Sequence, residues 1–165
     1  MIITFKEKVP LTKTMVFDEE CFHPKLKSPL YLKREFIKEI DHKLWMLVDG
    51  VLAGETYACQ LSHMLTLDTI PGSDYLRVNK DKTAYIYSTA IRPQFQGQGL
   101  GKVLKAYDLG LLKQKYTTVI GHARQGVSIH LSTTFGAKIK RHFEDWYGTG
   151  ETYFLYQLDL RGNTK

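Results

Sequence analysis

The chain has 165 residues, of which 43% are hydrophobic and 24% are charged, with a net charge of +6 at neutral pH. These values are typical of a globular protein, and we expect a single domain over residues 1–165. No apolar run approaches the roughly 20 residues that span a membrane, and residues 1–6 lack the form of a signal peptide, so we expect a cytoplasmic protein without a membrane partner. The 2 cysteines build no disulfide framework, and the 6 histidines show no metal-ligand spacing, so no metal is expected.

The positive charge permits anionic partners such as nucleotides, phosphorylated cofactors or nucleic acid. It does not choose among them, because the basic residues are scattered and their densest groups, within 25–34 and 138–141, are short. Such groups are typical of solvated faces, so a nucleic-acid partner stays open but has little support.

The first part of the chain predicts strands with one helix between them. Residues 2–6 predict a strand, and Ser28-Pro29 predicts the start of a helix through residue 40, because serine caps helices and proline suits the first helical position. Residues 43–48 predict a strand that Asp49-Gly50 turns back into a return strand over 51–60. Asp-Gly favours a tight hairpin because both central positions of that turn need a positive φ.

The middle of the chain contains a turn cluster and a long strand. Pro71-Gly72-Ser73-Asp74 indicates a turn, and we interpret residues 61–80 as a loop or insertion. Long loops in compact domains are often functional. A strand is predicted over 83–91, and it runs directly into a glycine-rich segment.

A helix is predicted after the glycines, because Leu100, Val103, Leu104, Tyr107 and Leu111 repeat at helical spacing. It is followed by a predicted strand, a short helix that ends before a glycine, and a last strand; these cover residues 117–123, 128–135 and 152–160. A hairpin early in the chain and alternating strands and helices later indicate a mixed α/β sheet.

The glycine-rich segment places Gly97, Gly99 and Gly101 between the strand and the helix. Glycines let a backbone approach a ligand closely, and a helix N-terminus offers unpaired N–H groups and a dipole that favour an anion. The spacing fits neither the P-loop, which needs Gly-x-x-x-x-Gly-Lys-Ser/Thr, nor the dinucleotide fingerprint Gly-x-Gly-x-x-Gly. A glycine-rich turn without a ligand stays open as an alternative.

Gln96-x-x-Gly99-x-Gly101, after a strand that ends in Ala90-Ile91-Arg92-Pro93, resembles the acetyl-CoA-binding motif of the GNAT superfamily of N-acetyltransferases, Arg/Gln-x-x-Gly-x-Gly/Ala. Downstream, residues 125–137 resemble the family segment that runs from an Asn through a helix to Gly-Phe. Residues 146–160 resemble the close of the RimI-like protein N-terminal acetyltransferases. The resemblance covers roughly residues 43–160 and implies the GNAT fold, an α/β fold whose mixed, mostly antiparallel central sheet is flanked by helices.

The resemblance also implies acetyl-CoA (coenzyme A) as the cofactor, with its pyrophosphate on the loop amides and its pantetheine arm along the preceding strand. Backbone amides at a helix N-terminus are physically suited to a diphosphate, and a strand N–H could polarise the thioester carbonyl. The cofactor-binding residues implied in this way are Thr89, Ile91, Gln96, Gly97, Gln98, Gly99, Leu100, Gly101, Lys102, Gln125 and Ser128.

Direct transfer to an amine needs one proton removed from the attacking ammonium and one delivered to the leaving thiolate. By resemblance, Ser132 stands where many members carry the tyrosine acid, and Tyr147 is the other candidate acid. His122, whose type has an unperturbed pKa of about 6.5, and Glu55 are candidate bases. Deprotonation through water is a third option, and each of these side chains also has a purely structural interpretation. No signature of a covalent acyl-enzyme surrounds either cysteine.

We therefore expect an N-acetyltransferase that moves an acetyl group from acetyl-CoA to a primary amine by direct transfer. Segments 20–35, 61–80 and 143–150 are expected to flank the acceptor. The RimI-like ending favours a protein amine over a small-molecule amine, and an aminoacyl-tRNA stays open. A non-catalytic CoA-binding sensor module is the alternative from another class, because Ser132 replaces the usual acid. A monomer and a homodimer are both compatible with the sequence.

Overall fold

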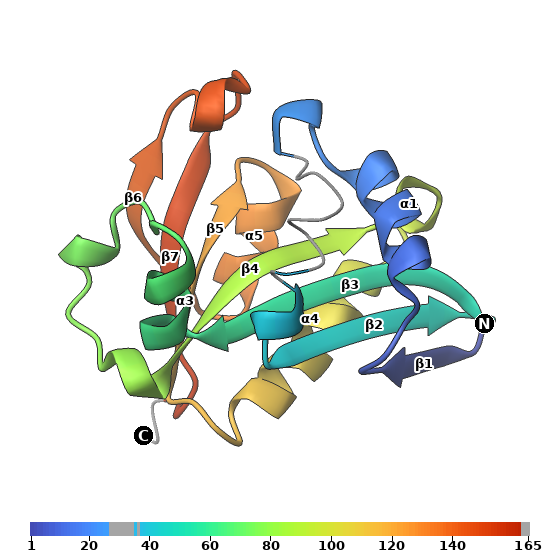
Figure 1. Cartoon of the computed structure of the whole chain (residues 1–165), viewed down its shortest axis with the longest axis horizontal. Helices are drawn as coiled ribbons and strands as arrows, with labels where there is room; N and C mark the ends of the chain where they lie inside the picture. The colour runs from blue at the N-terminus through green and yellow to red at the C-terminus, as the bar shows by residue number, and fades with distance from the viewer. Residues whose placement is uncertain (27–34, 36, 163–165) are drawn as a thin grey trace. The chain divides into compact units, whose positions relative to one another are not determined.

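The computed structural model describes residues 1–26, 35 and 37–162, and it contains a seven-stranded mixed sheet with helices (Figure 1). The strands are β1 (Ile3–Lys6), β2 (His42–Val48), β3 (Val51–Gln60), β4 (Thr83–Ile91), β5 (Thr118–Arg124), β6 (Lys138–Phe143) and β7 (Tyr153–Asp159). The helices are α1 (Leu11–Cys21), α3 (Leu61–Leu67), α4 (Leu100–Leu112) and α5 (Val127–Thr134).

The strand order is β1-β2-β3-β4-β5-β7-β6. β4 and β5 pair in parallel, whereas β1 with β2, β2 with β3, β5 with β7 and β6 with β7 pair antiparallel. This arrangement confirms the predicted fold class, a mixed and mostly antiparallel sheet with helices.

The chain forms two compact units. The first comprises Met1–Ala58 and Ser88–Asp108, and the second comprises Cys59–Tyr87 and Leu109–Lys165. The second half of β4, the glycine-rich loop and most of α4 belong to the first unit, whereas β5, β6 and β7 belong to the second.

The hairpin between β2 and β3 has the predicted turn. Asp49 and Gly50 have φ angles of 48° and 80°, as a primed two-residue turn requires. Val48 is opposite Val51 across this turn, and the register places Trp45 opposite Glu55. The register shifts by one residue between Met46 and Leu47, so the alignment at Glu55 depends on this irregularity as well as on the turn.

Helix α1 covers one face of the first unit through Phe17, which is fully buried in a cluster with Trp45 and Tyr57. Figure 1 shows α1 in front of β3, and α4 behind β2 and β3. The sequence analysis did not predict α1, because the two side chains described as buried in it are one polar and one apolar residue, Thr14 and Phe17, which show no apolar period. The helix predicted from Ser28-Pro29 falls mainly on residues 27–34 and 36, which lie outside the described residues.

Two elements of the second unit differ from the prediction. The loop expected over residues 61–80 begins with the short helix α3. Leu61 and Met64 are the only buried residues of this helix. Two apolar residues three positions apart are too few to show a helical period. Strand β6 was also missed, because its exposed, basic sequence has no apolar alternation and the strand is held by pairing with β7.

Candidate functional site

The glycine-rich loop is an exposed turn that leads into α4. Gly97 and Gly99 adopt the left-handed conformation, with φ angles of 75° and 76°, and a Cβ at either position would meet no atom within 4 Å. The glycines therefore serve the backbone path of the loop rather than close packing inside the protein. Open space beside them is compatible with a ligand lying against the backbone.

The N–H groups of Gly97 through Gly101 donate to no acceptor among the described residues. The neighbouring amides are used: the Lys102 and Val103 N–H groups donate to the Gly99 carbonyl at 3.0 and 3.3 Å. Consecutive unpaired N–H groups at the start of α4, where the helix dipole is positive, form a cradle for an anion. These amides fit the diphosphate of coenzyme A.

The end of β4 is tied to the loop by side chains predicted to bind the cofactor. The Gln96 Nε2 group donates to the Ile91 carbonyl at 2.8 Å, and Gln98 donates to the Gln94 carbonyl at 3.2 Å. Thr89 shares a hydrogen bond of 3.0 Å with Thr56 on β3. The side chains of Gln96 and Gln98 thus shape the loop from inside, while Lys102 is exposed and Leu100 is buried at the base of α4.

Glu55 lies in the interior of the first unit with no exposed surface, and its carboxylate accepts a hydrogen bond of 2.7 Å from the Tyr57 hydroxyl. Burial, reinforced by the Glu55 charge, raises the pKa of Tyr57. Burial and then the Glu55 carboxylate raise the pKa of Cys21 to about 12, so its thiol stays protonated at neutral pH. These contacts favour a structural role for Glu55, and its role as a base stays a prediction.

His122 on β5 is partly buried in the second unit, with both ring nitrogens in hydrogen bonds. Its Nε2 lies 3.0 Å from the Pro71 carbonyl, which can only accept, so Nε2 carries the proton and Nδ1 accepts from the Tyr85 hydroxyl at 3.0 Å. Burial lowers the pKa of His122 to about 4, against a smaller opposing effect of the Pro71 hydrogen bond. The imidazole is therefore neutral and already engaged, which favours a structural role; its role as a base stays a prediction.

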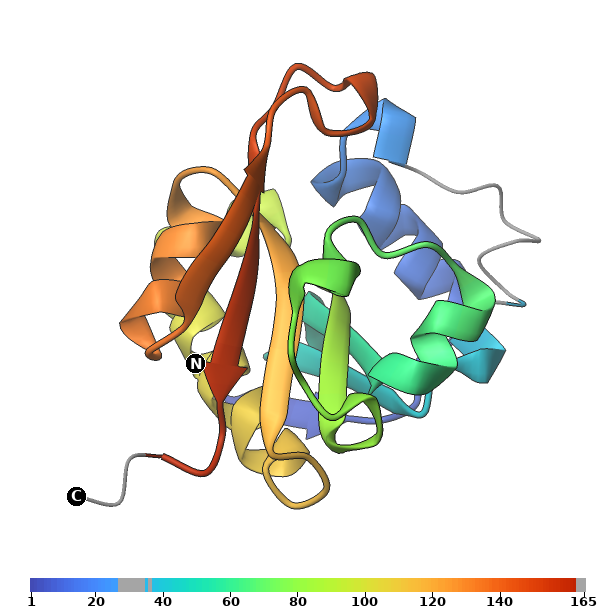
Figure 2. The same cartoon turned by 90° about the vertical axis from the view of Figure 1, so that its left-hand side faces the viewer.

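Tyr147 lies in the turn between β6 and β7. Figure 2 shows that this turn extends beyond the ends of the two strands. It is 60% exposed and holds a left-handed backbone with a φ of 48°, which is strained for a tyrosine. The turn is fixed by Asp145, whose carboxylate accepts from the Gly150 N–H at 2.7 Å. Partial burial, and then the Asp68 charge, raise the pKa of Tyr147, so its phenol stays protonated and able to donate.

Trp146 joins these two predicted residues, because its ring lies 4.6 Å from that of His122 and 4.9 Å from that of Tyr147. It also stacks on Tyr153 at 5.1 Å, and Phe143 packs against it at 5.4 Å. The sequence analysis did not single out Trp146, although three aromatic residues within 143–147 were a visible signal. We define this group of rings as the Trp146 cluster.

The other predicted residues of the second unit lie on or beside α5. Ser132 is 4% exposed, and its hydroxyl donates to the Ser128 carbonyl at 3.3 Å, one turn earlier in the helix. Gln125 and Ser128 are both exposed at the start of α5. A buried serine hydroxyl that bonds its own helix is poorly placed to donate a proton to a leaving group, so Ser132 as an acid stays a prediction with little geometric support.

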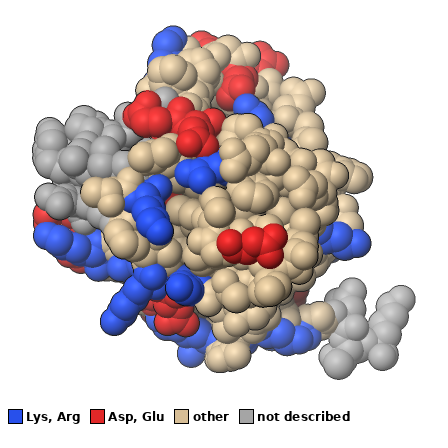
Figure 3. Space-filling model, turned by 90° about the vertical axis from the view of Figure 1, so that its right-hand side faces the viewer, with Lys and Arg blue, Asp and Glu red and all other residues tan. Residues whose placement is uncertain are grey.

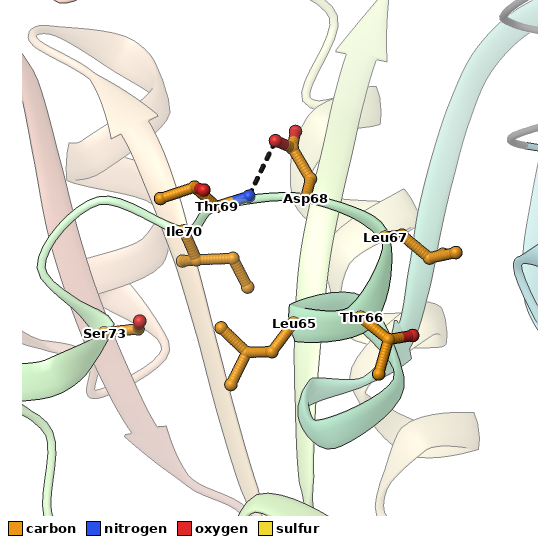
Figure 4. A pocket seen from close by; sticks show the side chains of 7 residues that line it. All are labelled: Leu65, Thr66, Leu67, Asp68, Thr69, Ile70 and Ser73. Carbon is orange, nitrogen blue, oxygen red and sulfur yellow. Dashed lines mark hydrogen bonds between the residues drawn. The ribbon is translucent and has the colours of Figure 1, made fainter.

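A shallow depression of about 460 Å³ in the second unit is lined by one continuous segment: Leu65, Thr66, Leu67, Asp68, Thr69, Ile70 and Ser73 (Figure 4). Leu65 and Ile70 point into it, and the Thr69 N–H donates to the Asp68 carboxylate at its rim at 2.7 Å. No convergent polar groups from other elements line it, so it offers little for recognising a ligand.

Neither the distribution of charge nor the spacing of possible metal ligands identifies a further site among the described residues. On the face drawn in Figure 3, the described residues place more acidic side chains in the upper half and more basic side chains in the lower half, and both signs occur in each half. Over residues 1–26, 35 and 37–162, no group of three or more His, Cys, Asp or Glu could hold a metal ion. Within the same ranges, no helix has the length and apolar character needed to cross a bilayer.

No family model and no curated protein matches the sequence. Solved structures do match along almost the whole chain. The ribosomal-protein-S18-alanine N-acetyltransferase from Escherichia coli is 14% identical with a TM-score of 0.70, and the match covers 99% of each chain. The GphF GNAT-like decarboxylase in complex with isobutyryl-CoA is 16% identical with a TM-score of 0.74, covering 98% of this chain and 100% of that one.

A third match is yncA, a putative acetyltransferase from Salmonella typhimurium, solved with its cofactor acetyl-CoA. It is 13% identical with a TM-score of 0.69, and the match covers 100% of this chain and 98% of that one. At these identities the similarity concerns the backbone. The chain therefore has the fold of the GNAT acetyltransferases, as the motif around Gly99 predicted.

Proposed function

We propose that this protein is an acetyl-CoA-dependent N-acetyltransferase that acts on a primary amine by direct transfer. The observation that carries the proposal is the row of unpaired N–H groups from Gly97 through Gly101 at the start of α4. The chain that carries this cradle shares its fold with proteins solved with acetyl-CoA or isobutyryl-CoA. When bound, acetyl-CoA supplies an acetyl group activated as a thioester.

The loop amides would bind the diphosphate, and Gly97 and Gly99 leave that backbone uncovered. The buried part of the loop, Leu100, anchors the start of α4 in the core, so the amides are held in place before the cofactor arrives. Prior ordering of this kind lowers the entropy lost on binding.

Tyr147 is the proposed proton donor for the leaving group, because its raised pKa keeps the phenol protonated and the residue is mostly exposed. For the amine, we propose loss of the proton to water. Both ring nitrogens of His122 are occupied, and the Glu55 carboxylate is buried beneath the surface and bonded to Tyr57. These contacts leave neither side chain open to an incoming ammonium.

The acceptor that we propose is a protein amine, with a small-molecule amine as the competing class. The support is the likeness to the E. coli enzyme whose name gives a ribosomal protein alanine as its acceptor, together with the RimI-like ending of this sequence. A test is thioester consumption with acetyl-CoA across peptides with free α-amines, peptides with lysine side chains and small polyamines.

A non-catalytic CoA-binding sensor is the second candidate, and one observation favours it. Ser132, at the position of the family tyrosine, is buried and its hydroxyl donates within its own helix, so it is poorly placed to serve as the acid. Calorimetric binding of acetyl-CoA without transfer to any acceptor of the panel would favour the sensor. Absence of binding would refute both candidates.

A further inference from the structure

Arg92 is the first residue after β4 and directly precedes the glycine-rich loop. A guanidinium beside an anion-binding loop is ordinarily expected to bind phosphate. Here the side chain is only 15% exposed, and its Nε lies 2.7 Å from a carboxylate oxygen of Glu20, near the end of α1. Nε makes no well-aligned hydrogen bond within the described residues, so the contact is an ion pair.

The Arg92 side chain is directed into the first unit rather than toward the loop. Its guanidinium carbon lies 5.7 Å from the centroid of the ring of Phe17, a residue of α1 that is fully buried in the core. An arginine sandwiched between a carboxylate and a buried ring has its charge already compensated. Withdrawing it to reach a phosphate would leave Glu20 without this partner.

The backbone at the same junction is fastened on its other side. The Arg92 N–H donates to the Ala53 carbonyl on β3 at 2.9 Å. A Cβ on Gly54 would lie 2.6 Å from the Ile91 side chain and 3.2 Å from the Leu104 side chain. The absence of a side chain at Gly54 therefore allows the end of β4 to pack against β3 and α4 at the point where the loop begins.

We propose that Arg92 is a positioning residue: its ion pair with Glu20 fastens the junction between β4 and the loop to α1, and thereby holds the loop amides in their anion-binding arrangement. Arg92 itself does not contact the cofactor phosphates. This inference rests on the proposed function, because it concerns the loop that binds acetyl-CoA.

The positioning role and the phosphate-ligand role predict opposite effects of Glu20→Gln. If Arg92 acts through Glu20, removing the carboxylate charge loosens the loop and weakens acetyl-CoA binding. If Arg92 were a phosphate ligand, the same substitution would release the guanidinium and leave binding unchanged or stronger. Arg92→Met weakens binding in both cases, so Glu20 is the residue that discriminates between them.

The experiment measures acetyl-CoA affinity by calorimetry and amide hydrogen exchange of residues 93–101 in the free protein, for Glu20→Gln, Arg92→Met and the double variant. Glu35→Gln is the matched control, because it removes one carboxylate charge from an exposed ion pair with Lys38 in the same unit. Thermal melting of each variant verifies that it is folded.

We expect each single variant to weaken binding about fivefold and to speed exchange in residues 93–101, and the double variant to add less than about twofold, as for two groups that act as one. Glu35→Gln should change neither property. Unchanged or tighter binding by Glu20→Gln would overturn the inference. If the native protein binds no acetyl-CoA, the proposed function fails, and unchanged exchange in both single variants would separately overturn the positioning role.

Discussion

Replacing Gly99 by Asp or by Asn isolates the charge preference of the glycine-rich loop. Both side chains have nearly the same size, both tolerate the left-handed backbone that Gly99 adopts at a φ of 76°, and neither Cβ would meet an atom within 4 Å. The two variants therefore differ mainly in one negative charge placed beside the N–H groups of the loop.

The size of the effect follows from electrostatics. A carboxylate about 5 Å from two phosphate charges is repelled by about 1.7 kcal/mol in a medium as polar as water. Because the loop is exposed, this aqueous value is the appropriate one, and it corresponds to about 15-fold weaker binding. The acetyl-CoA affinity of the Asn variant should fall only by the few-fold that backbone strain accounts for.

Calorimetric titration of acetyl-CoA into both variants at low and high salt measures this difference. We expect the difference in acetyl-CoA affinity between the Asp and Asn variants to shrink as salt screens the repulsion. Equal affinities of the two variants at low salt would refute the assignment of the diphosphate to this loop, because the added charge would then be remote from the ligand.

Three further predictions concern the second unit. His122 should stay neutral down to about pH 4 by NMR titration. Because its folded pKa lies below the ordinary 6.5, its contribution of about 3 kcal/mol to the free energy of unfolding is complete above pH 6.5 and is lost as the pH falls toward 4. His122→Gln should remove this part of the pH dependence of unfolding. Gly72→Ala should destabilise the protein by about 2–3 kcal/mol in denaturant unfolding, because its Cβ would lie 2.9 Å from Phe143; Gly150→Ala, at the same φ of 75° in open space, should cost only about 1 kcal/mol, and equal losses would refute the steric argument. Tyr147→Phe should slow acetyl transfer about 100-fold with acetyl-CoA affinity unchanged, and an undiminished rate would remove Tyr147 as the acid.

The elements that sequence reasoning predicted are those with local causes. The hairpin at Asp49-Gly50 depends on two adjacent φ angles, and the loop at Gly97 and Gly99 depends on residues that adopt a left-handed backbone at little cost. Strand β4 and helix α4 have apolar patterns long enough to show their periods. Such signals are carried by neighbouring residues and need no knowledge of the fold.

The features that could not be predicted depend on residues far apart in the chain. The low pKa of His122 comes from burial against the segment that contains Pro71, and the pairing of Arg92 with Glu20 depends on the packing of α1. The chemical type of His122 suggested a base, and its two hydrogen bonds favour a structural role for a neutral imidazole. Burial and tertiary hydrogen bonds decide such roles, and neither is written in the spacing of the residues.

Strand β6 bears on how copies of this protein can meet. It ends the strand order, its residues from Lys138 through His142 are exposed, and its register with β7 shifts between Ile139 and Arg141. A second copy adding its own β6 would bring the basic side chains Lys138, Lys140 and Arg141 of one copy close to those of the other, on an irregular ladder. Charge repulsion and the irregular register therefore disfavour strand addition at this end of the sheet, which argues against a homodimer built through β6.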